Sequence, residues 1–137
     1  MRRDTGLLHP VAVIALIVLF ANDHVWKYSH PSWLTGKLSD VAGMIVFPLA
    51  LAAGLSLVWT SERLLAGCVA ATMIVFTLVK LWAPATHACA CAMGWLQTPF
   101  SPVTPTTIIR DASDLLALPF SLVALWLPRR TSLAQDA

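Results

Sequence analysis

Four long apolar stretches constrain this chain more than any other feature of its sequence. They cover residues 7–22, 38–59, 64–82 and 108–127. Each is close to the length of about 20 mostly apolar residues that a helix needs to cross a lipid bilayer. Apolar residues make up 58% of the 137 residues and charged residues only 12%, which is unlike a soluble domain. The sequence therefore predicts an all-α integral membrane bundle of four transmembrane helices, multi-pass in the cell membrane.

The fourth stretch has the shortest uninterrupted apolar run. It offers only 14 residues from Asp114 to Leu127, whereas the hydrocarbon core of a bilayer is about 30 Å thick. We therefore expect this helix to include Arg110, Asp111 and Asp114 in its first turns. These side chains would then lie near or below the lipid headgroups.

The distribution of charges predicts the orientation of the bundle. With four spans both termini share one side, whose bases are Arg2, Arg3, Arg63, Arg129 and Arg130. The other side has four bases, and these are balanced by the four acids Asp23, Asp40, Asp111 and Asp114. Because excess Lys and Arg mark the cytoplasmic side, we expect both termini and residues 60–63 to be cytoplasmic. Residues 1–128 are predicted to form a single transmembrane domain, and residues 129–137 a short polar cytoplasmic tail.

The links between the expected spans differ in composition. The short link at residues 60–63 predicts an antiparallel helix hairpin. Small residues that let helices approach closely in lipid occur on both sides of this link, at Ala50, Gly54, Gly67 and Ala71. The longer link at residues 83–107 contains Pro84, Pro99, Pro102 and Pro105. Proline at this density disfavours a long helix, so we expect an irregular outer loop there.

Two of the apolar stretches begin in the same way. Ser39-Asp40 precedes Pro48 in the second stretch, and Ser113-Asp114 precedes Pro119 in the fourth. Parallel repeats of this kind occur in small transporters, with the binding site at the repeat interface. The pattern is equally compatible with a parallel two-helix repeat and with chance.

Ionisable side chains gather at the ends of the stretches on the predicted outer side. They are Asp23, His24, Lys27, Lys37, Asp40, Lys80, Arg110, Asp111 and Asp114. Ionisable groups at membrane depth are costly, so such a cluster usually marks a functional site. We interpret these residues as candidates for ligand binding or proton relay. The alternative is a set of structural ion pairs that tie the helix ends together.

Helical spacing predicts two local ion pairs within this cluster. Lys37 and Asp40 are three residues apart, and Arg110 and Asp114 are four apart, so each pair would share a helix face. If Asp40 and Asp114 come together, their carboxyl groups would share a proton or bind a cation, because close like charges do not both ionise cheaply. His24 is a candidate general base or proton relay near neutral pH.

A second candidate site lies in the expected outer loop. His87, Cys89, Cys91 and Met93 occupy alternate positions, and alternate side chains of an extended segment project to the same side. They would be placed to hold a soft metal such as Cu(I), the one cofactor that the sequence suggests. Two alternatives remain open. Cys89 and Cys91 form a disulfide or a redox-active pair, or the cysteines have no special role.

Two classes of function follow from the charged residues. In the first, the chain is an accessory or transport-type subunit whose charged residues form structural ion pairs or a proton path. Its partners would be lipid, another membrane protein or a second copy of the chain. In the second, it binds or transforms an anionic small molecule or lipid headgroup at the outer face, held by Lys37, Lys80 and Arg110. There is no GxSxG, HExxH or Walker motif and no basic patch suited to nucleic acid. The sequence therefore assigns no catalytic residue and leaves enzymatic activity open.

Overall fold

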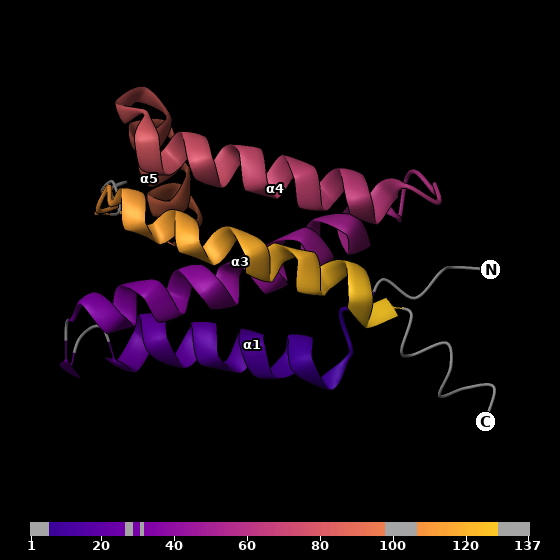
Figure 1. Ribbon diagram of the computed structural model, residues 1–137, viewed down its shortest axis with the longest axis horizontal. Coiled ribbons are helices and arrows are strands. Elements are labelled where there is room, and N and C mark those ends of the chain that lie inside the picture. The colour runs from indigo at the N-terminus through magenta and orange to yellow at the C-terminus, as the bar shows by residue number, and fades with distance from the viewer. Residues whose placement is uncertain (1–5, 27–28, 31, 98–106, 129–137) are drawn as a thin grey trace. The chain divides into compact units, whose positions relative to one another are not determined.

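A computed structural model describes residues 6–26, 29–30, 32–97 and 107–128 of the chain. Over these residues every regular element is a helix (Figure 1), which confirms the all-α prediction for the described part of the chain. The chain divides into two compact units. The first consists of Met1–Met73 with Leu116–Ala137, and the second of Ile74–Leu115.

The first unit begins with α1, Pro10–Ala21, which continues into the single π-helical turn η1, Asn22–Trp26. Asn22 lies at the junction of the two and is fully buried. Its side-chain Nδ2 donates a hydrogen bond of 2.7 Å to the backbone oxygen of Thr35. This bond ties the end of the first helix to the start of the next, so the two helices run in opposite directions.

The next helix, α3, covers Trp33–Leu55 and begins five residues before the predicted stretch at residue 38. A capping box explains the earlier start. The backbone N–H of Thr35 donates to Ser32 Oγ at 3.3 Å, and the N–H of Ser32 donates to Thr35 Oγ1 at 3.1 Å. These hydroxyl groups satisfy N–H groups that the first helical turn leaves without partners. The helix then passes through Pro48 without ending.

The helix α4 covers Leu64–Leu81, close to the predicted stretch at residues 64–82. Among the described residues, α3 and α4 are by length and composition the two helices long and apolar enough to cross a membrane. The α1–η1 segment and the last helical segment, Ala112–Pro128, are apolar but shorter.

The last helical segment begins as the 3-10 helix η2, Ala112–Leu122, and is α-helical from residue 123 to residue 128. The prediction that this helix begins at residue 108 and contains Arg110 and Asp111 is therefore wrong. The 11 residues of η2 rise about 2.0 Å each, against about 1.5 Å in an α-helix. With the α-helical end, the segment is about 31 Å long. It therefore has the length of a bilayer core without those two charged residues.

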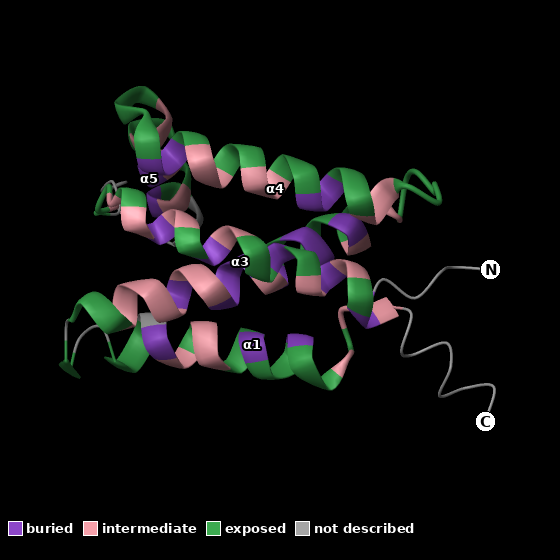
Figure 2. Ribbon diagram, viewed as in Figure 1, coloured by how far each residue is buried: buried purple, intermediate pink, exposed green. Residues whose placement is uncertain are grey.

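The buried core of the first unit combines segments that are far apart in the sequence. Ala12 of α1, Leu49 of α3, Val69 of α4, and Ala124 and Leu127 of the last helix form one buried cluster. Many large apolar side chains outside this cluster are exposed, above all on α1, where only Ala12 and Ala15 are buried (Figure 2).

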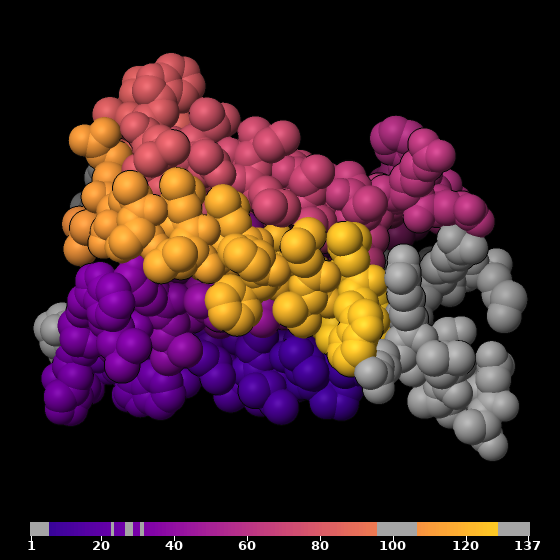
Figure 3. Space-filling view, in the orientation of Figure 1, coloured from indigo at the N-terminus to yellow at the C-terminus, as the bar shows by residue number. Residues whose placement is uncertain are grey.

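The two ends of the described chain meet in the first unit. Gly6 has a positive φ of 77°, a backbone conformation that residues with a Cβ atom rarely adopt. A Cβ atom at this position would lie 3.1 Å from the ring of Pro128. The start of the described chain at Gly6 and the end of the last helix therefore lie side by side, as the indigo and yellow surfaces show in Figure 3.

The predicted close approach of helices at small residues is wrong. Ala50, Gly54, Gly67 and Ala71 are all exposed. A Cβ atom at Gly54 or Gly67 would have no neighbouring atom within 4 Å. The small-residue spacing is present in both helices, but their contacts are made by other faces.

The second unit contains α5, Ala83–Gln97, where the sequence predicted an irregular loop. That prediction is wrong for these residues. Pro84 lies in the first turn of the helix, where a missing N–H costs little. The other three prolines of this segment follow residue 97 and fall outside the described residues. Thr86 joins α5 to the end of α4, because its Oγ1 donates to the backbone oxygen of Val79 at 2.5 Å.

Candidate functional site

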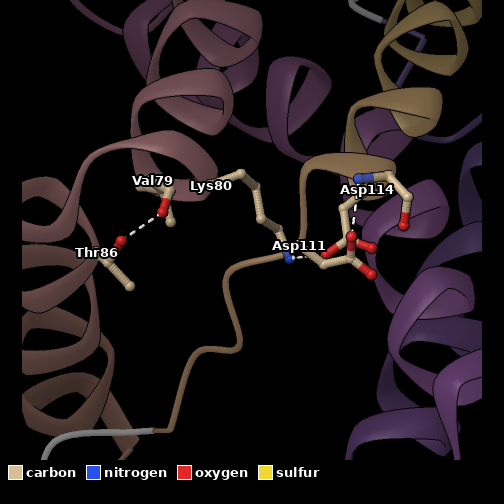
Figure 4. A network of polar contacts seen from close by, with 6 residues as sticks. Val79, Lys80, Thr86, Asp111 and Asp114 are labelled. Carbon is tan, nitrogen blue, oxygen red and sulfur yellow. Dashed lines mark hydrogen bonds and ion pairs between the residues drawn. The ribbon is translucent and has the colours of Figure 1, made fainter.

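The second unit contains a buried ion pair between two helices. Lys80 Nζ, in the last turn of α4, lies 2.6 Å from Asp114 Oδ2, in the first turn of η2. The two side chains are 9% and 10% exposed. Figure 4 shows the lysine side chain extending from α4 to the carboxylate. Both residues were predicted site residues, but the sequence paired Asp114 with Arg110.

Each charge of this pair occupies a favourable position on its helix. Lys80 lies near the carboxyl end of α4, where the helix dipole favours a cation, and Asp114 lies near the amino end of η2, where it favours an anion. The Lys80 ammonium also lies 5.5 Å from the centroid of the Phe76 ring one turn earlier, within the range of a cation–π interaction. The helix dipoles and the Phe76 ring thus stabilise the two charges in addition to their attraction for each other.

Asp111 has a structural role at the start of η2. Its Oδ1 accepts a hydrogen bond of 2.8 Å from the backbone N–H of Ser113, and its backbone oxygen accepts one of 3.0 Å from the N–H of Asp114. Asp111 therefore caps the helix and fixes the turn from which the Asp114 side chain projects (Figure 4). No sequence signal distinguishes this capping role from that of an acid available for a ligand.

Arg110 precedes η2 and is exposed. Four residues span one turn only inside an α-helix, so the spacing of Arg110 and Asp114 does not place them on one helix face. The interpretation of this spacing as a helical ion pair is wrong. Arg110 stays a candidate for contact with a ligand or a headgroup on the ground of its exposure alone.

Lys37 and Asp40 belong to the first unit and lie in the first turns of α3, so the predicted shared helix face is present. The Lys37 ammonium lies 4.7 Å from the centroid of the Trp33 ring. Asp40 is half-buried, and its neighbour Ser39 is buried. Asp114 belongs to the second unit, so the expected meeting of Asp40 with Asp114 stays a prediction.

His24 lies in η1 and is exposed. Its ring stacks on Phe20 with centroids 4.1 Å apart, and its Nδ1 lies 3.1 Å from the backbone oxygen of that residue. Because a carbonyl oxygen only accepts, Nδ1 is the donor of this contact. Lys27 and the side chain of Asp23 lie outside the described residues.

Asn22 is a buried polar residue that the sequence analysis did not single out. Among the described residues, its Oδ1 is a buried side-chain atom without a hydrogen-bond partner. The only signal for it was a polar residue at the end of an apolar run. A buried acceptor without a donor costs about 1–3 kcal/mol.

The four predicted soft-metal ligands lie on α5 rather than on an extended segment. A helix turns about 100° per residue, so His87 and Cys91 share one face, while Cys89 and Met93 share nearly the opposite face. His87 Nδ1 and Cys91 Sγ lie 3.3 Å apart. Within the described residues, no group of three or more His, Cys, Asp or Glu side chains is placed to hold a metal ion.

The helix also affects the predicted disulfide. All three cysteines are free thiols. Side chains two residues apart on a helix point in divergent directions, and a disulfide needs Cβ atoms about 3.5–4.5 Å apart. Cys89 and Cys91 therefore cannot form a disulfide while α5 is helical. Cys89 is half-buried, and this burial raises the pKa of its thiol above the ordinary value.

Comparison with known proteins found no protein-family model, no curated protein and no solved structure that matches this chain.

Proposed function

We propose that the chain is a small multi-pass membrane protein, an accessory or transport-type subunit, whose functional element is the Lys80–Asp114 ion pair. The observation that carries the proposal is the burial of this pair, with its two side chains only 9% and 10% exposed. Ionisable residues at membrane depth are rare, pair with one another, and mark proton and substrate paths.

The apolar surface supports a membrane location. Ile14, Ile17 and Phe20 of α1 are 60%, 61% and 64% exposed, and Ile74 and Val75 of α4 are 61% and 57% exposed. Ile14, Ile17 and Phe20 follow one another at intervals of three residues, so successive members share a helix face, and soluble monomers rarely expose large contiguous apolar patches. Lipid chains would cover these side chains at no cost.

Helix lengths and tryptophan positions agree with this location. The 23 residues of α3 measure about 34 Å and the 18 residues of α4 about 27 Å, close to the thickness of a bilayer core. Exposed Trp33 opens α3, Trp59 follows its end, and Trp82 follows α4. Tryptophan is enriched at both membrane interfaces, so each helix is bounded as a transmembrane span would be.

The path of the first unit supports four crossings with both termini on one side. Asn22 joins the end of α1 to the start of α3, and Gly6 lies against Pro128 at the other end. An even number of crossings returns the chain to the side on which it began. We accordingly propose a four-helix bundle with residues 60–63 and both termini in the cytoplasm.

The ion pair favours the subunit function over the binding of an anionic ligand. Lys80 was one of three cations expected to hold an anion, but its ammonium is engaged by Asp114 at 2.6 Å. An anion would have to displace a carboxylate from a nearly dry site. A proton or a small cation would instead compete with Lys80 for Asp114, which is the exchange that a transport path or a partner's basic residue would use.

Two measurements on the full chain test this proposal. In proteoliposomes loaded with a pH-sensitive dye, we expect the wild type to dissipate a pH gradient faster than empty vesicles and the double variant Lys80→Met/Asp114→Leu not to do so. If the protein is an accessory subunit, native mass spectrometry of gently solubilised membranes should instead find it bound to another membrane protein. A protein that neither moves protons nor binds a partner would contradict the proposal, and a stoichiometric phosphate-bearing lipid would favour the anion-binding class.

Thiol labelling tests the orientation. In intact cells, a membrane-impermeant maleimide should modify Cys91 and, more slowly, Cys89, while sparing Cys68 in α4. The slower reaction of Cys89 follows from its raised thiol pKa, because the thiolate is the reactive form. Protection of all three until lysis would place α5 in the cytoplasm and reverse the proposed orientation.

A further inference from the structure

Two potential metal ligands lie in direct contact on α5. His87 and Cys91 are four residues apart, so their side chains are stacked on one face of the helix. His87 Nδ1 and Cys91 Sγ are 3.3 Å apart. His87 is exposed and Cys91 is half-buried, so an ion in solution can reach both atoms.

The separation of the two atoms suits a tetrahedral metal ion. Zn²⁺ binds sulfur at about 2.3 Å and nitrogen at about 2.0–2.1 Å, which at a tetrahedral angle puts the two donors about 3.5 Å apart. The observed distance of 3.3 Å is slightly shorter than this value. A small rotation of either side chain would bring the two atoms to the separation that the ion requires. A linear two-coordinate ion such as Cu(I) would need a separation of about 4.3 Å with comparable bond lengths.

We propose that His87 and Cys91 form a two-ligand site for Zn²⁺ on the exposed face of α5. Water molecules complete the tetrahedral coordination. The site uses two of the four ligands that the sequence suggested, because the helix turns Cys89 and Met93 to nearly the opposite face. It does not depend on the proposed role of the Lys80–Asp114 pair.

Cobalt provides a spectroscopic test with the full-length protein in detergent after reduction. Co²⁺ should produce a near-ultraviolet charge-transfer absorption from a cysteine thiolate, and added Zn²⁺ should remove it. The absorption should be lost in Cys91→Ser and in His87→Gln, which keeps a polar side chain. Cys89→Ser, on the same helix but another face, and Cys68→Ser, in α4, are matched controls that should keep it. Circular dichroism should show equal helix content in all variants.

Several results would overturn the site. One is the absence of the absorption in the wild type, and another is its persistence in Cys91→Ser. Its persistence in His87→Gln would mean that the Cys91 thiolate binds the ion without the histidine. Loss of the absorption in Cys89→Ser would also contradict the proposal, because that residue can join Cys91 on one ion only if α5 unwinds.

Discussion

The dipeptide Ser-Asp occurs at residues 39–40 in α3 and at residues 113–114 in η2, and the structure buries opposite members of the two copies. In α3 the serine is buried and the aspartate is half-buried, whereas in η2 the aspartate is buried and the serine is half-buried. The lysine near Asp40 is Lys37, one turn away on the same helix. The lysine of Asp114 is 34 residues away on another helix.

The backbone accounts for part of this difference. Asp40 is the eighth residue of an α-helix, whereas Asp114 is the third residue of a 3-10 helix. Residues of a 3-10 helix turn about 120° each instead of about 100°, so equal spacings in the two helices point side chains in different directions. Similar residues near the starts of two helices therefore do not make similar sites, and the two helices do not share a repeated backbone.

The largest expected effect is at the pair in the second unit. Lys80→Met or Asp114→Asn alone should lower the free energy of unfolding by about 3–5 kcal/mol, because each leaves a buried polar partner without its counterpart. The double variant Lys80→Met/Asp114→Leu should lose much less. Denaturation in mixed micelles measures both. Additive losses in the double variant would show that the two residues are not coupled.

Proline is the next point at which the two helices can be compared. A proline ring clashes with the carbonyl of the residue four positions earlier in an α-helix, and Pro119 lies within η2. Pro119→Ala should let residues 112–122 become α-helical and shorten them by about 5 Å. Spin labels at the exposed positions Ala112 and Leu122 would report this by pulsed electron resonance.

A matched variant makes that comparison specific. Pro48→Ala removes a proline from α3, which is already α-helical around it. The distance between labels placed along α3 should therefore stay the same. An unchanged distance in Pro119→Ala as well would mean that tertiary contacts, rather than proline, maintain the 3-10 backbone.

The sequence predicted the apolar helices better than their ends. Hydropathy alone nearly predicts the bounds of α4, because Glu62 and Arg63 precede its apolar run and Trp82 follows it. The start of α3 depended on the Ser32–Thr35 capping box, which hydropathy does not detect. The prediction of a loop at residues 83–97 is wrong because the prolines are unevenly distributed along the link. Only Pro84 falls in the helix, in a first turn that tolerates proline.

The candidate site shows the same division between local and long-range information. The sequence identified Lys80 and Asp114 as costly charges, but their pairing depends on how α4 and η2 are placed within the second unit. The spacing of Arg110 suggested a nearer partner for Asp114. This pairing rule does not apply because Asp111 caps η2, so that the helix begins after Arg110. Spacing rules apply only inside an element, and the sequence did not locate the start of this one.

The capping residue of α3 should have a moderate effect. Ser32→Ala removes the hydroxyl that accepts from the Thr35 N–H and should lower the free energy of unfolding by about 1 kcal/mol. Thr60→Ala, an exposed hydroxyl outside the helices, should change it by less than about 0.5 kcal/mol. Equal small effects would indicate that packing alone determines the start of α3.

The smallest expected effect is the coupling between Lys37 and Asp40. These residues are neighbours on one partly exposed helix face, and such pairs contribute about 0.2–1 kcal/mol. A double-mutant cycle of Lys37→Ala and Asp40→Ala should therefore give an interaction energy below about 1 kcal/mol. The same cycle at Lys80 and Asp114 should give several times more, because those side chains are about nine-tenths buried. Equal coupling in the two cycles would remove the distinction between the two aspartates, since it would mean that Asp40 is as desolvated and as tightly paired as Asp114.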